Sequence, residues 1–122
     1  DTQTGSGTAI GEVPQGSVIS IGILQKGDIK ISAQNGLEDL LNKMKLNEDE
    51  GYRYSAVFAV SCVARYYVMA GDNGLEAETL RDGLSRNISL SGFYSFGEIC
   101  PTSIRGRANN AAHNESLALL AL

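Results

Sequence analysis

Two stretches near the start of the chain alternate apolar and other residues as β-strands do. Residues 16–24 (GSVISIGIL) place three isoleucines on one side, and residues 28–32 (DIKIS) place two more on one face. Alternating β-branched residues favour strands, and the short KGD sequence between the stretches favours a turn. The pattern predicts a β-hairpin, preceded by a linker or partly ordered lead-in over residues 1–15.

The pattern changes to a helical period in the middle of the chain. Apolar residues recur every three or four positions over residues 35–45, which predicts a helix there. Residues 54–60 (YSAVFAV) are apolar on both faces, as expected of a central strand. Two more helices are predicted over residues 62–69, with Ser61 as the N-cap, and over residues 76–86.

The last third of the chain has the pattern of strands. Residues 88–99 predict one or two strands around Gly92, and residues 116–122 predict a final apolar strand. We therefore expect one α+β domain over residues 16–122. Its expected architecture has two layers: a largely antiparallel sheet of about five strands, with three helices packed on it.

Composition narrows the classes of partner. Of the 122 residues 43% are hydrophobic and 20% charged, as in globular proteins, and the formal net charge is −4. An acidic chain with scattered Lys and Arg does not attract phosphate backbones, so no nucleic-acid partner is expected. No apolar run approaches the ~20 residues that span a bilayer, and no signal peptide is visible, so no membrane association is expected. Two cysteines are too few for a disulfide framework, which favours a cytoplasmic protein with reduced thiols.

Three patches contain the chemically distinctive residues. They are residues 60–65 (VSCVAR), residues 92–101 (GFYSFGEICP) and residues 113–117 (HNESL). In this order they resemble the C-terminal FIST domain family. That family's pattern has Ser-Cys with an Arg three positions after the Cys, then Gly-Phe-aromatic, Gly-Glu-Ile, and His-Asn-x-Thr or Ser. Every position is present, with Ser116 in the last one, and the resemblance runs from about residue 16 to residue 122.

The resemblance implies a non-catalytic sensory domain for signal transduction. Such a domain would bind a small ligand, either an amino acid or a carboxylate-like compound, and signal to a neighbouring domain. The implied protein partners are an N-terminal FIST domain and a signalling output domain or protein. A related group in the family is associated with haem and nitric oxide, so a haem-based sensor with His113 as axial ligand is one alternative. A dimerisation or docking domain without ligand, which uses a sheet edge or the final apolar strand and can form a homodimer, is another.

The first patch contains a thiol and a cation in an apolar setting. Cys62 at a helix N-terminus suits a ligand-facing thiol, and a small buried apolar residue is the other interpretation. The backbone amides after Ser61 suit a carboxylate ligand. Arg65 lies among apolar residues and therefore needs a partner. We expect either an ion pair with Glu98, a lone acid in an aromatic strand, or bidentate binding of a ligand carboxylate.

The remaining candidates have both a structural and a functional interpretation. His113 is the only histidine, and it is either hydrogen-bonded within the fold or a ligand; Asn114 beside it can satisfy loop backbone groups. Tyr94 is expected either to pack in the core or to line a pocket. The predicted ligand-binding residues are Ser61, Cys62, Arg65, Tyr94, Glu98, His113 and Asn114.

No catalytic residue, metal site or cofactor is predicted. The residue types of a cysteine hydrolase are present, with Cys62 as nucleophile, His113 as base and Glu98 as the acid that orients the base. However, no sequence signature of a cysteine hydrolase surrounds the cysteine. The two cysteines and the histidine lack the paired spacing of metal ligands. We therefore expect no enzyme activity, with haem as the only alternative cofactor.

Overall fold

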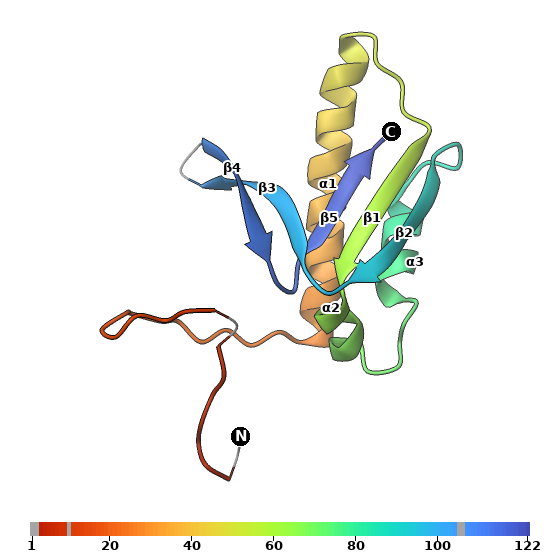
Figure 1. Cartoon of the computed structure of the whole chain (residues 1–122). Helices are drawn as coiled ribbons and strands as arrows, with labels where there is room; N and C mark the ends of the chain where they lie inside the picture. The colour runs from red at the N-terminus through yellow and green to blue at the C-terminus, as the bar shows by residue number, and fades with distance from the viewer. Residues whose placement is uncertain (1–2, 10, 105–106) are drawn as a thin grey trace.

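The computed structural model describes residues 3–9, 11–104 and 107–122, and these residues form eight helices and strands (Figure 1). In chain order they are α1 (Lys26–Asp49), β1 (Ala56–Cys62), α2 (Val63–Val68), α3 (Leu75–Gly83), β2 (Ser89–Ser95), β3 (Glu98–Ile104), β4 (Arg107–His113) and β5 (Leu117–Ala121). Three helices and five strands in the described part of the chain confirm the predicted α+β class.

The strands are divided between two sheets instead of forming one. The larger sheet has the order β2-β1-β5, with β1 parallel to β2 and antiparallel to β5. The smaller sheet is an antiparallel hairpin of β3 and β4. The parallel pair is joined through α2 and α3, so it is a strand–helix–strand crossover of the kind that parallel strands require.

Helices cover one face of the larger sheet. Figure 1 shows α1 and α3 on the same side of it. Val57 in β1 faces these helices and belongs to the buried core, whose other members are Ala33, Leu37, Met44, Leu80, Leu84 and Ile88. The opposite face carries aromatic residues, of which Phe58 and Phe93 are in edge-to-face contact with ring centroids 5.8 Å apart. Phe93 remains 57% exposed, so this face is open.

The predicted hairpin before the first helix is wrong. Residues 28–32 lie inside α1, which begins at Lys26. Ile29 and Ala33 are fully buried, whereas Ile31 is 56% exposed, as expected when one face of a helix packs on a core. The alternation of two isoleucines over five residues fits a helix as well as a strand, and the apolar positions further along α1 continue the helical face.

Residues 16–24 form no strand either. They lie outside every helix and strand, and they extend from the N-terminal end of α1 away from the two sheets (Figure 1). Strands need a hydrogen-bonded neighbour, and none of the described strands pairs with this segment. The predicted lead-in, where described (residues 3–9 and 11–15), also has no helix or strand.

The other predicted elements are present with shifted ends, and one strand was not predicted. The predicted strands over residues 88–99 correspond to β2 and the start of β3, and the final strand to β5. β4 was missed because its sequence, RANNAAH, has little apolar pattern. Its backbone pairing with β3 makes it a strand. In the described part of the chain, no helix is long and apolar enough to cross a membrane.

Candidate functional site

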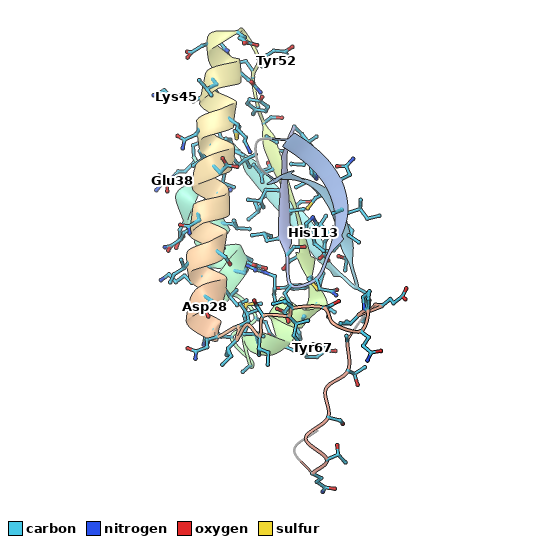
Figure 2. All side chains as sticks on the ribbon, turned by 90° about the vertical axis from the view of Figure 1, so that its left-hand side faces the viewer. Asp28, Glu38, Lys45, Tyr52, Tyr67 and His113 are labelled. Atoms are coloured by element: carbon cyan, nitrogen blue, oxygen red, sulfur yellow. The ribbon has the colours of Figure 1, made fainter. Side chains whose placement is uncertain are left out.

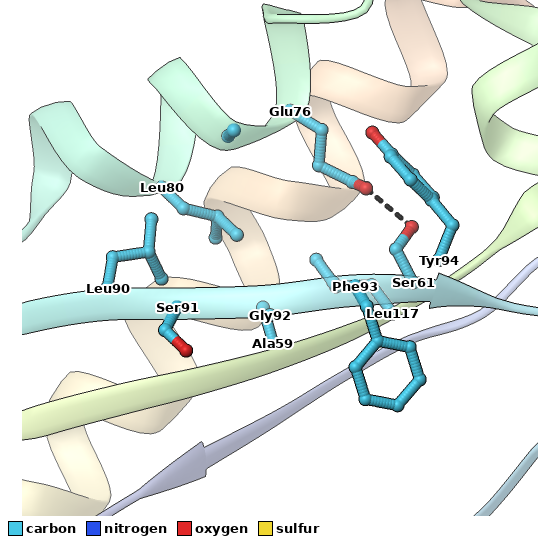
Figure 3. Close-up of a pocket in the computed structure, with 11 residues that line it drawn as sticks. Ala59, Ser61, Glu76, Leu80, Leu90, Ser91, Gly92, Phe93, Tyr94 and Leu117 are labelled. Atoms are coloured by element: carbon cyan, nitrogen blue, oxygen red, sulfur yellow. Dashed lines mark hydrogen bonds between the residues drawn. The ribbon is translucent and has the colours of Figure 1, made fainter.

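A cavity of about 270 Å³ lies between α3 and the covered face of the larger sheet (Figure 3). Its walls come from β1, β2, α3 and the first residue of β5. The lining residues are Ala59, Ser61, Glu76, Ala77, Leu80, Leu90, Ser91, Gly92, Phe93, Tyr94 and Leu117. The side chains are mostly apolar, and the polar groups that can orient a ligand are few, as is usual for small-molecule sites.

Gly92 allows β1 and β2 to approach closely in the wall of this cavity. A Cβ atom at this position would lie 2.0 Å from the carbonyl oxygen of Ala59 on the neighbouring strand. Any side chain here would therefore push β1 and β2 apart. The Gly-Phe-aromatic motif thus places a glycine where the two strands approach closely, and its aromatic residue, Tyr94, lines the same cavity.

The polar end of the cavity is formed by three residues from three elements. Ser61 on β1 donates a hydrogen bond from Oγ to Oε2 of Glu76 on α3, at 2.5 Å (Figure 3). The Tyr94 side chain on β2 points to the same end, as Figure 3 shows. Ser61 and Tyr94 sit opposite each other in the β1–β2 register, so the parallel pairing brings them together.

Burial raises the pKa of Tyr94 above its ordinary value of 10.0, and the negative charge of Glu76 raises it further. The nearby cation of Arg65 acts in the opposite direction. The Tyr94 ring also contacts Tyr66 edge-to-face, with centroids 5.2 Å apart. The phenol is therefore a neutral group at physiological pH, able to donate or accept a hydrogen bond at the polar end of the cavity.

Arg65 pairs with Glu76, so the expected ion pair with Glu98 is wrong. Both side chains of the observed pair are 3% exposed. Arg65 Nε donates to Glu76 Oε1 at 2.8 Å, and one terminal nitrogen donates to the same oxygen. The prediction failed because Glu76 lies in the first turn of an amphipathic helix, where acids are ordinarily solvated.

The same guanidinium also donates to three acceptors in two other parts of the chain. It donates to the carbonyl oxygen of Glu115 at 3.2 Å, to the carbonyl oxygen of Ile29 at 3.4 Å and to Oγ of Ser32 at 3.0 Å. Arg65 therefore connects α2 to α3, to α1 and to the turn between β4 and β5. A buried charge needs this number of partners to offset its desolvation.

Glu98 is also buried, at 4% exposed, but its partners are neutral. Ser95 donates to one carboxylate oxygen, and Ser116 donates to the other at 2.7 Å. Ser116 is the last residue of the His-Asn-x-Ser motif, so this contact joins that motif to Gly-Glu-Ile. The backbone carbonyl of Ser116 also accepts from the backbone N–H of Cys62 at 2.9 Å, which connects both motifs to Ser-Cys.

Cys62 and Ser61 differ from their predicted arrangement. β1 continues through Cys62, which is itself the N-cap of α2, and the cap has no side-chain hydrogen bond. Ser61 does not cap the helix, because its hydroxyl is bonded to Glu76. Cys62 is 3% exposed and does not line the cavity, which corresponds to the buried apolar interpretation of this residue.

His113 and Asn114 lie outside the cavity. His113 is opposite Glu98 in the register of the hairpin, and its Nε2 atom is buried without a hydrogen-bond partner in the described structure. Asn114 is exposed. Of the seven predicted ligand-binding residues, Ser61 and Tyr94 line the cavity, and Arg65 contacts it through Glu76. Within the described residues no group of three metal-ligating side chains is found.

A second hollow of about 600 Å³ follows the contact between α1 and α3. Its lining includes the charged residues Lys30, Glu38, Glu78 and Asp82, and it contains none of the seven predicted residues. It is a polar surface groove, whereas the first cavity combines apolar walls with a polar end at which Ser61 and Glu76 are buried and Tyr94 is 37% exposed. The first cavity is therefore the better candidate for a binding site.

Comparison with known families decides the identity of the domain. A family model described as FIST C domain matches residues 1–101, most of the chain. The chain belongs to the FIST C domain family. This FIST C domain therefore has a family association with signal transduction. The match includes every cavity residue except Leu117 and begins at residue 1, so it covers the lead-in too.

The other two comparisons found no related protein. No curated protein matches the chain, and no solved structure matches it. The family match ends before β4 and β5, so the contacts of Ser116 with Glu98 and of Arg65 with Glu115 lie partly beyond it. Glu76 is the one residue of central importance to the site that the sequence analysis missed. The sequence did contain an indication that Glu76 faces inward. Glu76 directly follows Leu75 and precedes Leu80 on the apolar side of the predicted helix.

Proposed function

We propose that this FIST C domain is a non-catalytic sensory domain that binds a small ligand in the cavity between α3, β1 and β2 and signals occupancy to a neighbouring domain. The observation that carries the proposal is the cavity itself. It has apolar walls, and Ser61, Glu76 and Tyr94 form its polar end. Family membership supports the signalling role.

The charges at the polar end favour an amino acid ligand with an aliphatic side chain. Glu76 is the charged residue among the described lining residues, and Arg65 already donates to it. A ligand amino group therefore meets a negative oxygen and the hydroxyls of Ser61 and Tyr94, whereas a carboxylate alone meets no free cation in this lining. An aliphatic side chain fits the walls formed by Leu80 and Leu90.

The hydrogen bonds of Arg65 connect the cavity to other parts of the domain. Its partner Glu76 contacts the cavity, and its other bonds reach α1 at Ile29 and Ser32 and the β4–β5 turn at Glu115. A ligand that attracts Glu76 weakens the hold of this carboxylate on Arg65 and alters those bonds. An N-terminal FIST domain and a signalling output domain are the proposed recipients, in a cytoplasmic protein.

A thermal-shift experiment with three matched compounds tests the proposal. Leucine has both charged groups, 3-methylbutylamine lacks the carboxylate, and 4-methylpentanoate lacks the amine. We expect leucine and the amine to stabilise the protein, by about 1.4 kcal/mol at ten times the Kd. The carboxylate should have no effect. Stabilisation by 4-methylpentanoate alone would contradict the proposed orientation, and stabilisation by none of them or of the other amino acids would contradict the proposal.

A matched pair of variants locates the binding. Ala77 lines the cavity and is exposed at its rim, so Ala77→Leu narrows the cavity without entering the core. Ala112→Leu makes the same change at an exposed position of β4 outside the cavity. The first variant should lose the ligand-induced shift and the second should retain it. Loss in both or retention in both would place the ligand elsewhere.

The haem alternative has less support from the geometry. His113 does not line the cavity, although its Nε2 atom is buried without a partner in the described structure. Haem reconstitution tests this alternative directly. A Soret band that changes in His113→Ala would favour haem sensing over the small-ligand proposal.

A further inference from the structure

Two parts of the chain have strand-like apolar sequences with at least one edge that no strand pairs with in the described structure. The first is residues 16–24, in which Val18, Ile21 and Ile23 are 98%, 90% and 82% exposed. The second is β5, with the sequence LALLA, which lies at the edge of the larger sheet. Residues apolar on both faces are typical of interior strands, because both of their faces are covered. Residues 16–24 therefore lack a covering partner. β5 pairs with β1 and packs Leu117, Leu119 and Ala121 against the core, so what it lacks in the described structure is a neighbour along its outer edge.

β5 has none of the usual protections of an edge strand. Edge strands are normally protected from pairing by charged residues, proline or bulges. The five residues of β5 are leucine and alanine, and Leu120 is 56% exposed on the open face of the sheet. In the described structure β5 pairs with β1 along one edge, and no strand pairs along the other. That free edge can accept one more strand.

The segment before α1 is chemically complementary to this edge. Residues 13–25 contain no charged side chain, so no charge would be buried when the segment joins a sheet. Its alternation would place Ile19, Ile21 and Ile23 on one face of the extended sheet. A peptide that adds to a sheet edge gains backbone hydrogen bonds from the edge and specificity from alternate side chains.

The connection to α1 favours a second copy of the chain over the segment's own sheet. A single residue, Gln25, separates the segment from α1, whereas connections between a strand and a helix usually span 2–6 residues. Gln25 is fixed, since its N–H donates to Asp28 Oδ2 at 2.8 Å, and the next residue, Lys26, pairs with Asp72 at 2.7 Å. These contacts hold the first residues of α1 in place at the point where the segment leaves the helix. Short hinge connections of this kind favour exchange of an element between copies.

We propose that the segment of residues 16–24 pairs with the free edge of β5 in a second copy of the chain. The reciprocal exchange makes a symmetric dimer in which each copy donates one strand and accepts one. The segment contributes no lining residue to the cavity, and β5 contributes only Leu117, its first residue, so the proposal does not rest on ligand binding.

Light scattering coupled to size-exclusion chromatography of the 122-residue chain tests the exchange. We expect a dimer, and we expect Ile19→Lys/Ile21→Lys to weaken self-association by at least ~100-fold, because two apolar side chains are replaced by charges that cannot be buried. Ile31→Lys is the control, since Ile31 is an equally apolar and 56% exposed residue of α1 outside the segment. The control should remain dimeric. A dimer that survives the double substitution would overturn the proposal.

Hydrogen exchange gives a second measurement that does not depend on the variants. Amides of residues 16–24 and of β5 should become protected together as protein concentration rises through the dimerisation range. Protection of the segment in a monomer would mean that it pairs within its own chain. A monomer without protection would mean that it does not pair. Either result overturns the exchange.

Discussion

The chain buries two carboxylates in different ways. Glu76 is held by the guanidinium of Arg65 and by one hydroxyl, whereas Glu98 is held by two hydroxyls. Glu76 also lines the cavity, and Glu98 does not. The first acid is thus part of an ion pair that reaches the cavity, and the second connects the β2–β3 corner to the start of β5. Figure 2 shows how the side chains are distributed over the helical and the sheet side of the molecule.

Because their partners differ, the two acids should contribute unequally to the stability of the fold. Removing one partner of a buried ion pair leaves an uncompensated charge, which costs more than the pair contributes when intact. Removing a carboxylate bound only by hydroxyls leaves neutral groups that can rotate toward other acceptors or water. The stability of the fold should therefore depend more on Glu76 than on Glu98.

The largest expected effect is that of Glu76→Ala. This substitution leaves Arg65 buried without its anion, and we expect a loss of about 3–5 kcal/mol in the free energy of unfolding. Urea denaturation followed by circular dichroism measures it. Glu78→Ala is the control, because Glu78 is exposed on the same helix and should change stability by less than ~0.5 kcal/mol.

The double substitution Arg65→Met/Glu76→Met sharpens this interpretation. Replacing both charges with apolar groups of similar volume should restore most of the stability that Glu76→Ala loses. A double variant as unstable as the single one would show that the remaining bonds of Arg65, to α1 and Glu115, carry the stability instead.

A smaller effect is expected for Glu98→Ala. Two hydroxyls, of Ser95 and Ser116, lose a charged acceptor, and we expect a loss of about 2 kcal/mol. Glu98→Gln retains an acceptor oxygen and should lose less than half of that amount in the same denaturation experiment. If Glu98→Ala proves more destabilising than Glu76→Ala, the ranking of the two acids is reversed and the comparison fails.

The smallest effect concerns the ionisation of Tyr94 at high pH. Because burial and Glu76 raise the pKa of this phenol in the folded state, the folded protein holds the proton more tightly than the unfolded chain does. The contribution of Tyr94 to the free energy of unfolding is therefore fully present below its ordinary pKa of 10.0. It is lost as the pH rises through the higher pKa of the folded state. Ultraviolet titration of the wild type against Tyr94→Phe should show one phenol ionising late. A difference spectrum centred at or below pH 10.0 would contradict the direction of the shift.

The sequence predicts some parts of this molecule well because their signals are local. Three elements were predicted from the apolar pattern of a few neighbouring residues, and all three are present. They are the strand over residues 54–60 and the helices near residues 62–69 and 76–86. Ser61 and Tyr94, which belong to two of the motifs, line the same cavity. Their meeting requires only that β1 and β2 pair in register.

Other parts depend on contacts between distant residues and could not be predicted this way. The choice of Glu76 over Glu98 as the partner of Arg65 depends on how α3 packs over β1, which no local pattern contains. Residues 28–32 fit a strand or a helix equally well until the core is known. β4 is a strand because β3 lies beside it, and its own polar sequence gives little indication.

The measurement that tests the account most directly is chemical-shift mapping of the nitrogen-15-labelled protein with leucine. Binding in the proposed cavity should shift the backbone amides of Ser61, Gly92 and Tyr94, which line it from two strands, and should leave the exposed residues of the α1–α3 groove unchanged. The same titration with Glu76→Gln should show weaker shifts, because the negative oxygen is lost. Shifts confined to the groove, or none at millimolar leucine, would contradict the proposed site.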